Sequence, residues 1–159
     1  MRRKTIIGVI GAGRATASGE ELAVRVGGLI AERGGVLVCG GLGGIMQAAS
    51  RGCYDADGEV LGVLPGNSAA TANPYVTIPI VTNMGHARNI IIAHTADALI
   101  AIEGEYGTLS EIAISLKLGK PVVQLDSWLQ IDTGLRAETP EQAVEMVFNA
   151  LGAGVADDN

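Results

Sequence analysis

The chain has 159 residues, of which 48% are hydrophobic, 18% are charged and 3% are aromatic, and its formal net charge is −6 at pH 7. This length suits one domain, residues 1–159, and the acidic, aromatic-poor composition argues against nucleic acid as a partner, because that role needs basic and stacking side chains. No apolar stretch is long enough to span a bilayer and no secretory signal is visible, so we expect a cytoplasmic protein without a membrane partner.

Strand and helix patterns alternate along the whole chain. In chain order we expect a strand at 4–10, a helix at 20–33, a strand at 36–39, a helix at 45–54, strands at 59–64 and 76–81, a helix at 85–95, a strand at 97–102, a helix at 108–118, a strand at 121–125 and a last helix from 139 onward. Pro79 favours an edge position for its strand, and residues 152–159 are expected to be a disordered tail. The alternation predicts an α/β, Rossmann-like, three-layer, doubly wound fold with a mainly parallel sheet and helices on both faces.

Glycine-rich turns follow the first two strands. The first turn contains Gly-Ala-Gly-Arg at 11–14, although Thr16 interrupts the Gly-x-Gly-x-x-Gly pattern of dinucleotide-binding folds. The second contains Gly-Gly-Leu-Gly-Gly at 40–44. Both turns lead from a strand into a helix, where backbone N–H groups without partners can hold a phosphate or another anion. The candidate binding residues here are Gly11, Gly13, Arg14, Gly40, Gly41, Gly43 and Gly44.

A third turn carries the most information. It reads Gly-Glu-Tyr-Gly-Thr at 104–108 and joins the strand at 97–102 to the helix at 108–118. Thr108 can cap this helix, and Glu111 completes a capping-box spacing. The simpler interpretation is a well-capped helix alone. Together with the two earlier turns, however, it predicts one crevice at the carboxyl ends of the strands, with Gly104, Glu105, Tyr106, Gly107 and Thr108 as candidate ligand contacts.

These motifs resemble the Lonely Guy-type (SLOG) superfamily of Rossmann-like proteins, once mislabelled lysine decarboxylases, over residues 6–125. Hydrolases of that superfamily carry Pro-Gly-Gly-x-Gly-Thr-x-x-Glu, which Gly104, Gly107, Thr108 and Glu111 match, whereas Glu103 replaces the proline and Glu105 the second glycine. The superfamily's Met-His-x-Arg-Lys is similar to residues 84–89, where Arg88 matches and Asn89 replaces the lysine. Its Gly-Gly-Gly-x-x-Gly-Leu-Met is similar to residues 40–46.

The Gly-Glu-x-Gly-Thr form of the third turn is similar to a sister branch that includes the molybdenum cofactor carrier proteins. The resemblance implies a binding or carrier protein for a phosphorylated nucleotide-like ligand, with the molybdenum cofactor or a nucleotide as the bound group and no cofactor required. It also implies a homodimer or homotetramer. The apolar residues at 90–92, together with Ile112, Ile114 and Leu116, favour such an assembly, because they exceed what one sheet contact covers.

An enzymatic alternative rests on Arg88 and Glu111. In the hydrolases the matching residues act at the ribose of a nucleoside 5′-monophosphate, where a carboxylate stabilises positive charge on the sugar or activates water. A purely structural ion pair between two helix starts is the competing interpretation. A third possibility is an assembly module with a vestigial pocket.

Glu103 and Glu105 stand against anion binding, since two carboxylates beside a phosphate would repel it by roughly 1–4 kcal/mol. Either side chain could be solvated, pair with Arg14 or Arg88, or accept hydrogen bonds from a heterocycle such as a pterin.

The remaining polar and sulfur-containing residues suggest no further chemistry. Cys39 and Cys53 are expected to be reduced and buried. His86 and His94 are expected at the surface or in packing, with no metal site. Lys117 and Lys120 suit the dipole at the end of the helix at 108–118.

Overall fold

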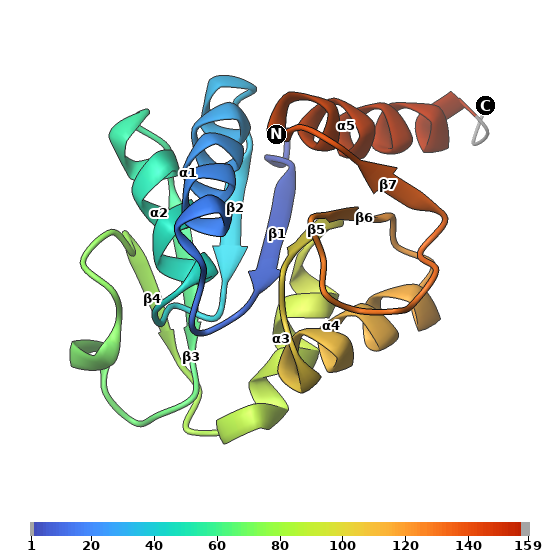
Figure 1. Ribbon diagram of the computed structural model, residues 1–159. Coiled ribbons are helices and arrows are strands. Elements are labelled where there is room, and N and C mark those ends of the chain that lie inside the picture. The colour runs from blue at the N-terminus through green and yellow to red at the C-terminus, as the bar shows by residue number, and fades with distance from the viewer. Residues whose placement is uncertain (1, 157–159) are drawn as a thin grey trace.

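The computed structural model describes the backbone of residues 2–156 and the side chains of residues 2–152 (Figure 1). Seven strands form one sheet in the order β4-β3-β2-β1-β5-β6-β7, and every neighbouring pair is parallel. The strands are β1 (Ile6–Gly11), β2 (Val36–Cys39), β3 (Val60–Leu64), β4 (Ile78–Val81), β5 (Ala98–Ile102), β6 (Val122–Leu125) and β7 (Leu135–Ala137).

Five helices cover the sheet: α1 (Ala17–Glu32), α2 (Ile45–Asp55), α3 (Arg88–Thr95), α4 (Tyr106–Lys117) and α5 (Pro140–Ala156). One core cluster joins α1, α2 and α5 to one face, and a second joins α3 and α4 to the other. This arrangement confirms the predicted doubly wound α/β fold. Strand order reverses between β1 and β5, and such a reversal opens a crevice at the carboxyl ends of the strands.

Several predicted boundaries need correction. Helix α1 begins at Ala17 because Thr16 caps it, its Oγ1 accepting a hydrogen bond from the N–H of Gly19. The helix predicted at 85–95 is a 3₁₀ turn, Gly85–Ala87, followed by α3. The short edge strand β7 was not predicted, whereas Pro79 does lie on the other edge strand, β4.

The predicted tail is wrong over residues 152–156, since α5 continues through Ala156; residues 157–159 lie outside the described part of the chain.

The expected capping box at the start of α4 is also wrong. The N-cap is Glu105, which makes no side-chain capping bond, and both Thr108 and Glu111 lie inside the helix and are buried. Before this helix, Glu103 and Gly104 have φ of 54° and 109°, and the helix starts at Tyr106, two residues earlier than predicted.

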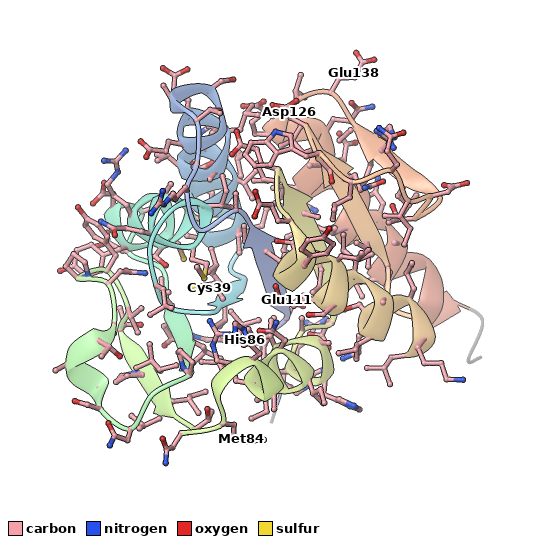
Figure 2. All side chains as sticks on the ribbon, turned by 60° about the horizontal axis from the view of Figure 1, so that its bottom comes forward. Cys39, Met84, His86, Glu111, Asp126 and Glu138 are labelled. Carbon is pink, nitrogen blue, oxygen red and sulfur yellow. The ribbon has the colours of Figure 1, made fainter. Side chains whose placement is uncertain are left out.

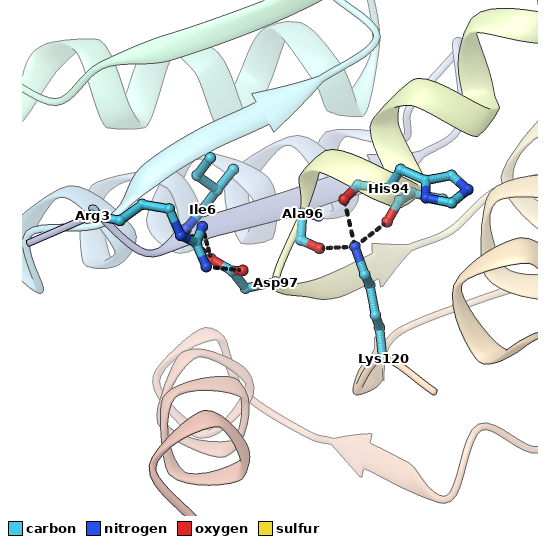
Figure 3. Close-up of polar contacts among 7 residues, drawn as sticks. Arg3, Ile6, His94, Ala96, Asp97 and Lys120 are labelled. Atoms are coloured by element: carbon cyan, nitrogen blue, oxygen red, sulfur yellow. Dashed lines mark hydrogen bonds and ion pairs between the residues drawn. The ribbon is translucent and has the colours of Figure 1, made fainter. Parts of the chain in front are cut away.

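Lys120 acts on a different helix from the one predicted. Its Nζ donates to the carbonyl oxygens of Ala93, His94 and Ala96 at 2.5–2.7 Å, so it satisfies the end of α3 (Figure 3). Lys117 does lie in the last turn of α4, as expected. Beside this cap, Asp97 accepts hydrogen bonds from the guanidinium of Arg3 and the N–H of Ile6, which fixes the start of β5 (Figure 3).

Among the described residues, no helix combines the length and the apolar character needed to cross a bilayer.

Candidate functional site

A cavity of about 730 Å³ lies at the carboxyl ends of the strands, where strand order reverses. Figure 2 looks toward this end of the molecule, with Glu111, His86 and Cys39 close to its centre. We call the cavity the crevice. Its lining comes from the end of β1, from the segments that follow β1, β2, β3, β4 and β5, and from one residue beyond β6.

The crevice brings together nine of the predicted site residues: Gly11, Gly13, Arg14, Gly40, Arg88, Glu105, Gly107, Thr108 and Glu111. The other five do not line it: Gly41, Gly43, Gly44, Gly104 and Tyr106. Backbone geometry explains two of these. Gly41 has φ of 75° and a Cβ there would lie 2.6 Å from Leu64, while a Cβ on Gly104 would lie 2.6 Å from the hydroxyl of Thr108. Tyr106 is 88% exposed.

Arg88 is the buried cation of the crevice. At the first residue of α3, its Nε donates to the Val63 carbonyl at 2.9 Å and its Nη1 to Asn89 Oδ1 at 2.9 Å. Nη2 lies 3.5 Å from the Gly40 carbonyl, and a side chain at Gly40 would collide with the guanidinium. Since a guanidinium has five N–H donors, two remain for a ligand.

Asn89 connects Arg88 to helix α4. Its Nδ2 donates to the hydroxyl of Ser110 at 3.1 Å and lies 3.5 Å from the Gly107 carbonyl, while its Oδ1 accepts from Arg88. In the position of the superfamily's lysine, this asparagine therefore fixes the buried arginine against the start of α4.

The first turn of α4 supplies backbone donors. The first intrahelical bond runs from the N–H of Leu109 to the carbonyl of Glu105, so the N–H groups of residues 106–108 have no acceptor within the helix. Gly107 and Thr108 face the crevice, and the space beside Gly107 is open. Together with the helix dipole, these donors favour an anion.

Glu111 places a carboxyl group in the wall of the crevice. Burial raises its pKa to about 8, against the opposing effect of the positive charge of Arg88. Between the described side chains of Arg88 and Glu111 there is no ion pair within 4.0 Å. The structural ion pair considered from the sequence is therefore wrong, and burial favours the protonated form of Glu111.

The two glutamates of the third turn, Glu103 and Glu105, differ in burial and in position relative to the crevice. Glu105 is exposed and lines the crevice. Glu103 is fully buried and accepts hydrogen bonds from the hydroxyl and the N–H of Thr16. For Glu103, solvation and pairing with Arg14 or Arg88 are thus both wrong, and its carboxylate does not face the crevice.

Sequence reasoning missed part of the lining. Trp128, 45% exposed on the segment after β6, borders the crevice and is the only tryptophan of the chain. His86 lines it too, and Pro65, Leu42 and Met46 add apolar surface. The one available signal for Trp128 was its rarity in a chain with so few aromatic residues.

Both cysteines are free and buried, as predicted. The Cys39 thiol lies 3.4 Å from the hydroxyl of Ser50 and accepts a hydrogen bond from the N–H of Gly41, and burial raises its pKa. Through the hydrogen bond from Gly41, the Cys39 thiol stabilises the second glycine turn. In the part of the chain that the structure describes, no three His, Cys, Asp or Glu residues are placed to share a metal ion.

Comparisons with known proteins agree with this fold. The structure resembles that of the molybdenum cofactor carrier protein MCP from Chlamydomonas reinhardtii, with a TM-score of 0.86, 35% identity, and coverage of 94% of this chain and 99% of the other. An uncharacterized protein of Archaeoglobus fulgidus is 51% identical over 145 residues, 91% of this chain and 95% of that protein.

A third relative is an enzyme by name. The cytokinin riboside 5′-monophosphate phosphoribohydrolase of Mycobacterium tuberculosis is 36% identical over 129 residues, 74% of this chain and 67% of the enzyme. The family model described as the SLOG cluster4 family matches residues 4–152. The chain therefore belongs to the SLOG cluster4 family.

Proposed function

We propose that the protein binds a phosphorylated, nucleotide-like ligand in the crevice and acts as a carrier, with the molybdenum cofactor as the leading candidate cargo. The observation that carries the proposal is the convergence of Arg88 with the free N–H groups of Gly107 and Thr108 on one cavity. Arginine and a helix start are the two groups that proteins use most readily for phosphate.

The dimensions and chemistry of the crevice suit such a cargo. Its volume of about 730 Å³ lies within the range of small-molecule sites. Gly13 and Gly107 have open space where a Cβ would be, so a ligand can approach the backbone. Trp128 offers an aromatic face, and Glu105 an acceptor, for a heterocycle rich in N–H groups.

The electrostatic objection to an anion is weaker than the sequence suggests. Glu103 is bound elsewhere, and the raised pKa of Glu111 leaves most of that carboxyl group uncharged at pH 7. Only Glu105 remains as an exposed carboxylate beside the crevice, opposed by the positive charge of Arg88.

The proposal also includes a cellular location and an oligomeric state. A cytoplasmic location fits two buried, unpaired cysteines. Assembly into a homodimer or homotetramer fits the exposed apolar side chains near the crevice, Met84, Ile90 and Tyr106.

The second candidate is a phosphoribohydrolase, which the shared position of Arg88 and Glu111 in the crevice favours. One feature opposes it: the replacement of the proline and glycine by Glu103 and Glu105.

Fluorescence of the single tryptophan, Trp128, provides the test. The phosphorylated pterin cofactor, released anaerobically from a molybdoenzyme, and 5′-AMP are titrated separately, and chromatography follows any free adenine. We expect saturable quenching by the pterin and no turnover of AMP at about 1 per second or faster. Arg88→Met should weaken binding at least tenfold, whereas Arg51→Met, at an exposed arginine outside the crevice, should not.

The opposite results separate the candidates. Rapid release of adenine that is lost in Glu111→Gln would establish the hydrolase. Absence of binding by either compound would remove the carrier proposal.

A further inference from the structure

Glu103 lies at the positive end of helix α1. At the carboxyl end of β5, its carboxylate accepts hydrogen bonds from the Thr16 hydroxyl at 2.5 Å and from the Thr16 N–H at 3.2 Å. Thr16 in turn caps α1 through the N–H of Gly19. A chain of hydrogen bonds therefore runs from the first turn of α1 to a fully buried carboxylate 87 residues away in sequence.

The surroundings of Glu103 are shaped around its carboxylate. A Cβ at position 19 would collide with the carboxylate oxygens of Glu103. The carboxylate fits there because residue 19 is a glycine. Glu103 itself has φ of 54°, which is unusual for a residue with a side chain. Its N–H donates to the Asp126 carbonyl at 3.1 Å, which holds this conformation. Backbone strain maintained in this way points to a specific role for the side chain.

The position that Glu103 occupies has a known use in related architectures. In dinucleotide-binding βαβ units, the glycine turn after the first strand and the start of the next helix hold the pyrophosphate. Here the turn at residues 11–14 lines the crevice, but the donors of Thr16 are already bound to Glu103. A second phosphate that approached the start of α1 would meet occupied donors and a like charge.

The start of α4 is different. The N–H groups of Gly107 and Thr108 face the crevice and have no acceptor within the helix. The turn that leads into α1 thus lines the crevice, but Thr16 at the start of that helix is already bound to Glu103, whereas the start of α4 is available to a ligand.

We infer that Glu103 is a built-in anion that fills the phosphate position at the start of α1 and restricts the crevice to ligands with a single phosphate. This inference rests on the proposed function and narrows it: a phosphomonoester binds, and a pyrophosphate-linked dinucleotide is rejected. Glu103 is a specificity residue that acts from outside the crevice.

The test compares 5′-AMP with ADP-ribose, which adds a second phosphate and a sugar to the same nucleotide. Affinities are measured by calorimetry for the wild type and for Glu103→Gln, which keeps the shape and removes the charge. The wild type should bind ADP-ribose at least roughly tenfold more weakly than AMP, and Glu103→Gln should narrow this ratio by roughly tenfold. Glu20→Gln is the matched control, because it neutralises an exposed carboxylate in the first turn of the same helix.

Two outcomes of these titrations would contradict the role given to Glu103. Equal affinity of the wild type for AMP and ADP-ribose would overturn the inference. A Glu103→Gln variant that binds both ligands more weakly by the same factor would also overturn it, because Glu103 would then act only on the stability of the fold. In either case AMP binding leaves the proposed function standing. If neither ligand nor the phosphorylated pterin binds, the proposed function fails and this inference with it. Thermal unfolding checks that Glu103→Gln is folded, and a folded variant that keeps the wild-type ratio would also overturn the inference. Equal affinity of the wild type for the two ligands overturns it whatever the variant does.

Discussion

Single residues in the crevice are held by partners that the motif alone does not reveal. The guanidinium of Arg88 already donates hydrogen bonds to the Val63 carbonyl and to Asn89. Only some of its N–H groups are therefore available to a ligand. The sequence identified Arg88 and Glu111 because both follow strand ends in family-like motifs. It could not identify the burial of Glu103, because that depends on a contact with Thr16 that only the folded chain creates.

Asn89 is predicted to matter for both stability and binding. Asn89→Ala removes the side-chain acceptor of the buried Arg88 guanidinium and the amide group that donates to the Ser110 hydroxyl. We expect a loss of about 1–3 kcal/mol in the free energy of unfolding and weaker ligand binding. Urea unfolding measures the first. Asn149→Ala, at an exposed position, is the control; equal stability of the two variants would contradict the role given to Asn89.

Glu111 predicts a pH dependence of stability. Its pKa is raised in the folded protein from 4.5 to about 8, so the folded state favours the protonated form. The contribution of Glu111 to the free energy of unfolding is therefore most favourable below pH 4.5 and is lost as the pH rises from 4.5 to about 8. The total loss is at most about 5 kcal/mol.

Glu111→Gln should remove this dependence. The variant should match the wild type at pH 5 and exceed it in unfolding free energy at pH 9, in urea titrations across that range. Parallel curves for the two proteins would show that Glu111 is ionised in the folded state at neutral pH.

At the scale of elements, the glycine turns and the alternation of apolar strands with helices were enough to predict six of the seven strands and all five helices. Strand β7 has only three residues and lies at the edge, so it leaves almost no pattern. Helix α4 begins at residue 106 after a turn in which Glu103 and Gly104 adopt positive φ, and the capping-box spacing could not indicate this start.

Lys120 is predicted to stabilise helix α3, the short helix that begins with Arg88. Lys120→Met keeps the aliphatic stem and removes the donor from three carbonyl oxygens. We expect a loss of about 1–2 kcal/mol in unfolding free energy. Lys117→Met, at an exposed position in the last turn of α4, should cost less than 0.5 kcal/mol by comparison. An equal effect of the two substitutions in urea unfolding would contradict the capping role.

For the whole molecule, strand order explains why distant motifs share one site. Because the order reverses between β1 and β5, the segments after both strands open onto the same crevice. The position of Trp128 was beyond sequence analysis, since the segment after β6 has no regular pattern and the fold alone brings it to the crevice.

Oligomerisation stays a prediction at this scale. Part of the apolar surplus seen in the sequence is buried within one chain, since Ile92 and Ile112 belong to the core against α3 and α4. Ile90 remains 48% exposed, and Met84 50%. We expect light scattering to give a dimer or a tetramer, and Ile90→Glu to shift it toward the monomer. A wild-type mass near 16.2 kDa across micromolar concentrations would contradict this expectation.

The most direct test of the central claim is a crystal structure of the protein with a saturating nucleoside 5′-monophosphate. We predict phosphate oxygens within hydrogen-bonding distance of the N–H groups of Gly107 and Thr108 and near the guanidinium of Arg88, with the base toward Trp128. A ligand seated instead in the groove between α1 and α2, beside Gly28 and Gly52, or a crevice that stays empty at millimolar ligand, would contradict it.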